Sequence, residues 1–388
     1  MRKPVNRGDN ARNERGERGG TSSVRQVEIT IDVSDAAGLG RSAAVRATVV
    51  LPDAAALPES PVLCLALPSS SYARGYYTCA LPGPARDAGA QAAFHAARGW
   101  IFAALDWPGC DGTGDIDPED LGYAVLAAVA HAAQCEILLR LANGVLAPGY
   151  PPVSPACVIG IGQALGAALL IYQQARHRSF DGIGVLGFSA IHAHPATPPG
   201  GRPVTVAWYP RDARLEECRE PLNAALLAQA GDAAAQAAWE ALAWGFHHDD
   251  VPLDVVEQDL AHYEGIARYG QSRDQGQDQT ELADAPSPPW YARRTPQRAA
   301  RSTLTPGIVA SEAAAITVPV LTAMGERDLV PDPRAEPRAY PSATSIDLFV
   351  CPRMGHVHNM ARTRALLWER IHMFGALCTA IKYMGRST

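Results

Sequence analysis

The sequence predicts an α/β protein with a doubly wound, mostly parallel sheet and an inserted, mainly helical lid. Three observations lead to this prediction. Short, continuously apolar runs are separated by alanine-rich stretches of good helix formers, which is the pattern of strands buried between two helical layers. This alternation stops for about 120 residues and resumes near the C-terminus. At 388 residues, 47% of them hydrophobic, the chain can bury one large core and carry such an insertion.

The strands are expected in two groups. The first two, residues 26–33 and 43–51, alternate between apolar and polar side chains, which is typical of strands with one exposed face, and they are expected to open the sheet as a hairpin. The later runs are apolar throughout and are expected to form the buried parallel part of the sheet: residues 62–67, 100–105, 156–161, 182–187, 318–324 and 345–350.

The helices between these strands are expected at residues 87–98, 122–141, 165–176 and 358–383, each bounded by Gly or Pro. We therefore predict four segments in the chain. They are a disordered N-terminal tail (residues 1–24), the first part of an α/β core (25–194), a lid insertion (195–316) and the second part of the core (317–388).

Composition limits the classes of partner. A formal net charge of −6 provides no basic field that could hold a polyanion, so nucleic acid is not expected as a partner. Apolar runs are interrupted by Gly, Pro or charge before they reach the roughly 20 residues that span a bilayer, so no membrane partner is expected either. The eight cysteines include no C-x-x-C pair and indicate buried thiols in a reducing compartment. Together with the lack of a secretory signal pattern, they favour a cytoplasmic location.

The fifth expected strand runs into Gly162-Gln163-Ala164-Leu165-Gly166 and then directly into a helix. This stretch resembles the G-x-S-x-G nucleophile elbow of the α/β-hydrolase superfamily, in which small residues on either side let a sharp turn pack against its neighbours. Ala164 occupies the position of the nucleophilic serine. A G-x-x-x-G spacing alone is common in alanine-rich chains, so this interpretation depends on further residues.

Two later turns complete the resemblance. A strand ends before Asp328, where the superfamily carries its catalytic acid, and the last strand is followed by Gly355-His356, which matches the turn that carries the catalytic histidine. Nucleophile, acid and histidine thus follow in the order of the family, each after the carboxyl end of a strand. Glu326 is an alternative acid and His358 an alternative histidine, although His358 falls within an expected helix.

The resemblance implies a hydrolase of carboxylic esters or lactones that needs neither metal nor cofactor. In such an enzyme a serine attacks, His356 moves the proton and Asp328 orients the imidazole. Ala164 cannot attack, so the chain as given is expected to be catalytically dead. Because the acid and the histidine are retained, we interpret Ala164 as a serine-to-alanine replacement that traps substrate. The alternative is a ligand-binding pseudoenzyme of the same fold.

The resemblance also implies an oxyanion hole built from backbone N–H groups. One donor is expected to be the amide of Leu165. The second is expected in the loop after the strand at residues 62–67, where this chain has Ser69 and Ser70 and the family usually has His-Gly or a glycine-rich run. The choice between the two serines stays open. Ser70 as the nucleophile itself is a weaker alternative, because it lies on the wrong loop.

The substrate pocket is expected between the strand ends and the lid. Tyr72, Trp208, Trp244 and Phe246 are candidate walls, although at least half of the lid's aromatic side chains are expected to form the lid's own core. Such a wall favours a bulky hydrophobic ester or lactone as the small-molecule partner. Assembly into a homo-oligomer is left open by the sequence.

Overall fold

The computed structural model describes residues 24–110, 116–201, 203, 206–214, 231–272 and 287–386. The N-terminal tail expected at residues 1–24 therefore lies outside the described residues, except for Val24.

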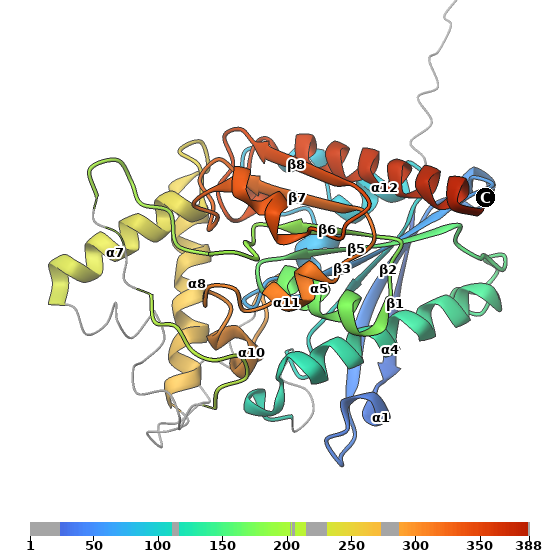
Figure 1. Ribbon diagram of the computed structural model, residues 1–388, viewed down its shortest axis with the longest axis horizontal. Coiled ribbons are helices and arrows are strands. Elements are labelled where there is room, and N and C mark those ends of the chain that lie inside the picture. The colour runs from blue at the N-terminus through green and yellow to red at the C-terminus, as the bar shows by residue number, and fades with distance from the viewer. Residues whose placement is uncertain are drawn as a thin grey trace, which may run out of the picture.

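Among the described residues, one eight-stranded sheet forms the centre of the molecule, with the strand order β1-β2-β4-β3-β5-β6-β7-β8 (Figure 1). Strand β2 pairs antiparallel with β1 and with β4, and the remaining pairs are parallel. All eight predicted strands are confirmed, as is the doubly wound α/β class. The strands are β1 (Arg25–Asp32), β2 (Ala44–Leu51), β3 (Val62–Leu67), β4 (Ile101–Leu105), β5 (Cys157–Gln163), β6 (Gly182–Leu186), β7 (Val320–Gly325) and β8 (Ile346–Cys351).

Both faces of the sheet are buried, which explains the continuous apolar runs. In β3, Leu63 and Leu65 belong to the core cluster on one face, whereas Cys64 and Ala66 belong to the cluster on the other. Successive side chains of a strand point to opposite faces, so a strand between two helical layers needs apolar residues at every position. Strand β1 lies at the edge of the sheet and keeps the alternating exposure that its sequence predicts.

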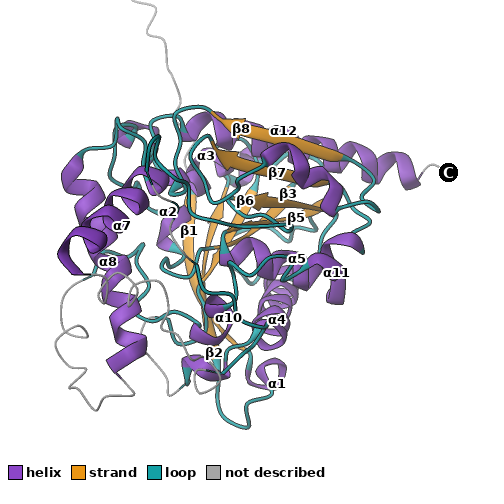
Figure 2. Cartoon of the chain, turned by 60° about the vertical axis from the view of Figure 1, so that its left-hand side comes forward, coloured by secondary structure: helices purple, strands orange, loops and turns teal. Residues whose placement is uncertain are grey.

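Helices cover the two faces (Figure 2). Helices α4 (Tyr123–Ala142) and α5 (Leu165–His177) supply side chains to the cluster that contains Leu63, and α3 (Gln91–Ala96) and α12 (Arg364–Arg386) supply side chains to the cluster that contains Cys64. The short elements of the core are α1 (Ser34–Ala37), α2 (Gly75–Thr78), η1 (Ala54–Ala56), η2 (Arg86–Ala88), η3 (Pro118–Asp120), η5 (Pro333–Ala339) and η6 (His358–Met360).

Two predicted helices differ in the structure. The helix expected at residues 87–98 is split into η2 and α3, because Gly89 adopts a φ of 73° that does not continue a helix. The helix expected at residues 358–383 begins only at Arg364. Its expected first turn is η6, held out of the helix by Asn359, which donates to the backbone oxygen of Tyr76 and accepts from the indole N–H of Trp368.

The insertion at residues 195–316 has two structural parts. Helices α7 (Gly231–Phe246) and α8 (Leu253–Ser272) lie beside the ends of the strands at one side of the sheet (Figure 1). The later part contains α10 (Gln297–Arg301) and α11 (Ala310–Ala314) and packs back onto the core, where Val309 and Ala313 join the same cluster as α5.

Helix α4 is the one described helix that is long and apolar enough to cross a membrane by length and composition. No segment of this kind was expected from the sequence. In the structure 44% of its apolar window is buried, and Leu126 and Ile137 pack into the core with α5. Its apolar character is accounted for by this packing.

Helix α12 provides a matched pair of glycines that tests its docking on the sheet. A methyl group at Gly375 would lie 2.3 Å and 2.5 Å from ring atoms of the buried Trp100, whereas one at Gly385 would meet nothing within 4 Å. Gly375→Ala is expected to lower the free energy of unfolding by about 1–3 kcal/mol through overpacking. Gly385→Ala is expected to leave it unchanged or raise it slightly, because alanine is the better helix former. Urea unfolding of the two variants measures both changes. Equal changes in the free energy of unfolding would contradict this docking.

Candidate active site

The turn at Ala164 joins strand to helix with almost no intervening chain. Strand β5 ends at Gln163 and α5 begins at Leu165, and Ala164 between them has φ 49° and ψ −113°. A positive φ in a residue with a Cβ is strained, at a cost on the order of 1–3 kcal/mol. The backbone N–H of Ala164 donates to the oxygen of Leu186 at 3.0 Å, which fixes the turn against β6.

The two glycines of this turn are required by close backbone contacts. A Cβ on Gly162 would lie 2.3 Å from the oxygen of Gly166, and a Cβ on Gly166 would lie 2.3 Å from the oxygen of Leu67. No side chain fits at either distance, so the elbow packs backbone directly on backbone. This contact brings the loop after β3 beside position 164.

His356 and Asp328 form a buried pair behind this turn. The Nδ1 atom of His356 lies 2.7 Å from Oδ1 of Asp328, and the backbone N–H groups of Gly325 and Leu329 also donate to the carboxylate, at 2.8 Å and 2.7 Å. Glu326, the alternative acid, has a side chain that is 41% exposed and pairs with Nε2 of His248 instead. The geometry favours Asp328 as the group that orients His356.

Asp328 is held in its ionised form. Burial by itself would raise the pKa of this carboxyl, but the charges and hydrogen bonds of His356 and His358 outweigh burial and hold the pKa well below its ordinary value. An ionised carboxylate accepts the Nδ1–H of His356, which leaves Nε2 as the nitrogen that can take a proton on the cavity side.

His358 contacts the same carboxylate from the other side. Its Nε2 lies 2.8 Å from Oδ2 of Asp328, and its side chain is buried in the turn η6. The residue does not line the cavity. His358 is thus a second partner of the acid. It lies in the 3-10 turn η6 before α12 and not within the long C-terminal helix where it was expected.

The candidate oxyanion donors lie beside Ala164. Leu165 is the first residue of α5, and the first N–H groups of a helix have no acceptor within it. Ser69 and Ser70 line the same cavity. Their carbonyl groups are committed, since Ser69 accepts from the indole N–H of Trp107 and Ser70 from the hydroxyl of Thr295. No hydrogen bond from either serine amide occurs within the described residues, so both stay candidates for the second donor.

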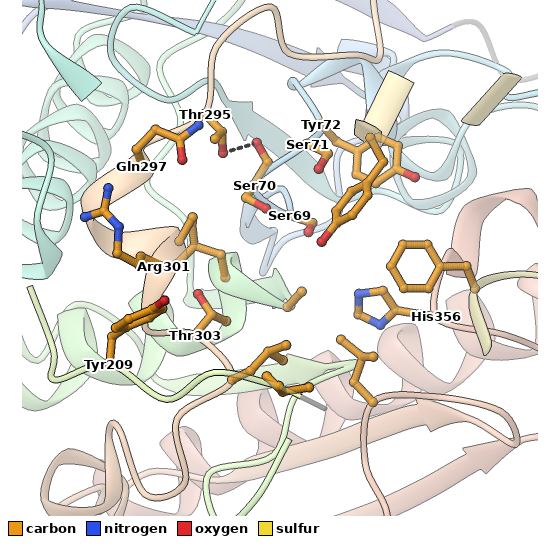
Figure 3. Close-up of a pocket in the computed structure, with 18 of the residues that line it drawn as sticks. Ser69, Ser70, Ser71, Tyr72, Tyr209, Thr295, Gln297, Arg301, Thr303 and His356 are labelled. Atoms are coloured by element: carbon orange, nitrogen blue, oxygen red, sulfur yellow. Dashed lines mark hydrogen bonds between the residues drawn. The ribbon is translucent and has the colours of Figure 1, made fainter. Parts of the chain in front are cut away.

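A cavity of about 130 Å³ joins these groups (Figure 3). Ala164, Leu165 and His356 line it together with Tyr72 and Phe246, two of the expected walls. The other lining residues are Ser69, Ser70, Ser71, Val206, Ala207, Tyr209, Tyr263, Thr295, Gln297, Ala300, Arg301, Thr303, Leu304 and Leu329.

Two of the expected wall residues, Trp208 and Trp244, are not in this cavity. Trp208 is 60% exposed, because its side chain points away while its neighbours Ala207 and Tyr209 face inward. Trp244 lines a separate hollow of the insertion. The Cζ atom of Arg327 lies 4.5 Å from the centroid of its ring. Sequence alone could not determine which side of these segments faces the core.

Two buried groups near the site were not predicted. Gln163 donates from its amide to the backbone oxygen of His356 and so ties the elbow to the histidine loop. Asp259 on α8 accepts from the hydroxyl of Tyr72 at 2.7 Å and lies 3.0 Å from Nε2 of His247. Gln163 could have been suspected from its place beside position 164, whereas nothing in the sequence distinguishes Asp259 from a surface carboxylate.

Among the described residues, no three or more His, Cys, Asp or Glu side chains lie close enough together to hold a metal ion. The paired histidines of the site instead share the Asp328 carboxylate through hydrogen bonds.

Comparison with solved structures identifies the fold. A bromoperoxidase from Bacillus anthracis has 12% identity and a TM-score of 0.50, with 90% of this chain and 99% of that chain covered. An esterase from Exiguobacterium antarcticum has 13% identity and a TM-score of 0.50, with 86% of this chain and 96% of that chain covered. No family model matches the sequence, and no curated protein matches it. The chain has the α/β-hydrolase fold.

The strain at the elbow can be measured by removing the Cβ that causes it. Ala164→Gly is expected to raise the free energy of unfolding by about 1 kcal/mol, because glycine adopts a positive φ without strain. Ala167→Gly, three residues later inside α5, is expected to lower it by about 1 kcal/mol. Chemical unfolding of the two variants measures both effects. A loss of stability in both would show that residue 164 is not strained.

The lowered pKa of Asp328 predicts a pH dependence. Its folded-state pKa lies below the unfolded value of about 3.9, so the stability it contributes is present above that pH and is lost as the pH falls. Urea unfolding gives the free energy of unfolding of the unaltered chain and of Asp328→Asn. The amount by which the unaltered chain is the more stable, its advantage, is expected to fall by about 1 kcal/mol from pH 6 to pH 3. An advantage that stays constant or grows toward pH 3 would contradict the ionised carboxylate.

Proposed function

We propose that this chain, an α/β-hydrolase by fold, is built to hydrolyse carboxylic esters or lactones and carries alanine in place of the nucleophilic serine. One observation carries the proposal: Ala164 sits on a strained strand-to-helix elbow and lines the same cavity as His356, whose Nδ1 is paired with the buried Asp328. This is the arrangement that activates a serine hydroxyl. The esterase from Exiguobacterium antarcticum, similar in fold, is consistent with this class of reaction.

The reaction follows from the geometry once a hydroxyl is present. In the Ala164→Ser protein, the hydroxyl oxygen attacks the carbonyl carbon of the ester while His356 Nε2 takes the proton. Asp328 holds the imidazole in the required tautomer and stabilises the imidazolium. The backbone N–H of Leu165 and that of Ser69 or Ser70 stabilise the oxyanion. His356 then protonates the leaving alcohol, and water hydrolyses the acyl-enzyme by the same steps in reverse order.

With alanine at position 164 the covalent step cannot occur. The methyl group neither attacks nor holds a proton, so the chain is proposed to bind its ester or lactone and release it unchanged. Losing a triad serine costs on the order of a million-fold in turnover, and a small residual rate from binding and oxyanion stabilisation is expected. We infer that Ala164 is a serine-to-alanine replacement, because the groups that a serine would need are held in place around it.

The test is to restore the hydroxyl. Ala164→Ser is expected to raise the hydrolysis rate of aryl esters or lactones by roughly a million-fold over the unaltered chain. The double variant Ala164→Ser/His356→Ala is expected to lose that gain, because the hydroxyl then has no base. Initial rates over a panel of esters and lactones measure both effects and rank the substrates.

A specific outcome would favour the alternative function. If Ala164→Ser hydrolyses no member of the panel while calorimetry shows that the unaltered chain binds one of them, the cavity serves as a binding site without chemistry. A gain in rate that survives the loss of His356 would place the catalytic base elsewhere and contradict the triad.

A further inference from the structure

The cavity has a second, polar end away from His356. In Figure 3 the side chains of Gln297, Arg301 and Thr303 lie on the side opposite His356, with Thr295 above them. Gln297 and Arg301 belong to the short helix α10, which packs back onto the core and so gives this end a fixed wall. A substrate that reaches from position 164 to α10 would meet hydrogen-bonding groups there rather than a purely apolar surface.

Gln297 presents a side-chain amide at this end, beside Arg301, whose buried Nε–H has no partner among the described residues. The residue is only 7% exposed and lines the cavity, yet its side-chain amide makes no hydrogen bond within the described residues. Figure 3 shows the amide end turned toward Thr295 and Ser70. The amide oxygen and nitrogen are accessible from the cavity, so a polar group that enters it can form hydrogen bonds with them.

The charged group beside it is already neutralised. The side chain of Arg301 is 2% exposed, and its guanidinium pairs with the carboxylate of Glu119 and donates to the backbone oxygen of Ala213 at 2.8 Å. A carboxylate or phosphate on the ligand would find no unpaired cation here, and its burial without one would be unfavourable. This end of the cavity therefore favours an uncharged polar group.

The two threonine hydroxyls at this end donate hydrogen bonds to the protein itself. Thr295 donates to the oxygen of Ser70 at 2.6 Å and Thr303 to the oxygen of Ala299 at 3.3 Å, so both present only lone pairs to the cavity. Gln297 adds one acceptor oxygen and one donor NH₂. The complementary ligand group must both donate and accept hydrogen bonds. An amide has a donor N–H and an acceptor oxygen in one plane, so it can pair with the Gln297 amide in either of the two orientations of that side chain.

We propose that Gln297 is a specificity-determining residue that binds an uncharged amide of the substrate, so that the substrate is a compact ester or lactone carrying an amide away from its reacting carbonyl. This inference rests on the proposed function for the placement of the reacting carbonyl at position 164. The cavity volume of about 130 Å³ is close to the roughly 150 Å³ that accommodates benzene, which keeps the bound part of the substrate small.

The experiment uses three aryl esters of equal chain length. They are an acetamido-butyrate, the matching oxo-heptanoate, in which a methylene replaces the amide N–H, and plain heptanoate. With Ala164→Ser, the kcat/KM of the amide ester is expected to exceed that of the heptanoate about tenfold, the value of one or two hydrogen bonds, with the ketone between them. Spacer lengths are varied in parallel.

The ratio of the rates on amide ester and heptanoate is the readout, so any loss of folded protein cancels. Adding Gln297→Met, which keeps the volume and removes the amide, is expected to bring the ratio close to one. Arg298→Met is the control: Arg298 lies on the same helix, donates to the backbone oxygen of Asp212 and does not line the cavity, so the ratio should stay near tenfold. A ratio that Gln297→Met leaves unchanged overturns the proposal, as does a ratio of one at every spacer length with Ala164→Ser.

Failure of the proposed function is distinguishable from failure of this inference. If Ala164→Ser hydrolyses none of the esters, the hydrolase proposal fails, and the subsite is decided by calorimetry on the unaltered chain. Binding of the acetamido-butyrate ester that weakens about tenfold on Gln297→Met supports the amide subsite. Binding of that ester with the same affinity in both proteins, or with no more affinity than heptanoate, overturns it.

Discussion

The direct packing of backbone on backbone around residue 164 determines where the other groups of the site lie. Gly162 contacts Gly166, and Gly166 contacts the end of β3, at distances that exclude any side chain. The turn can then reverse the chain within one residue, at the cost of a positive φ at Ala164. Parallel strands bring their carboxyl ends to one edge, so the turns after β3, β7 and β8 meet at this same point.

The insertion is attached at two places to the loops that flank position 164. The end of α7 accepts backbone hydrogen bonds from the histidine loop, where His356 donates to Gly245 and Val357 to Phe246, each at 2.9 Å. Helix α8 contributes the buried Asp259, which holds Tyr72 beside the candidate oxyanion loop. Residues of the insertion thus line the cavity and also form hydrogen bonds with the loops on either side of position 164.

The sheet, the elbow and the histidine turn could be predicted because each leaves a local pattern: continuous apolar runs, a G-x-x-x-G turn between strand and helix, and Gly355-His356 after the last strand. The role of His358 could not, since it depends on η6 being held out of α12 by contacts with distant residues. The cavity walls were predicted least well. Trp208 is apolar but exposed, whereas Gln297 is polar but buried and lines the cavity. The segments that carry these two residues have no periodicity from which to deduce their inner face.

If position 164 is a nucleophile position that His356 activates, a serine restored there will react with a covalent label. A fluorophosphonate reacts with an activated serine by forming an oxygen–phosphorus bond and releasing fluoride. Mass spectrometry of digested Ala164→Ser is predicted to find the adduct on residue 164, with none on the unaltered chain or on Ala164→Ser/His356→Ala. Labelling of Ser69 or Ser70 in the unaltered chain, or no labelling of Ala164→Ser, would contradict the account.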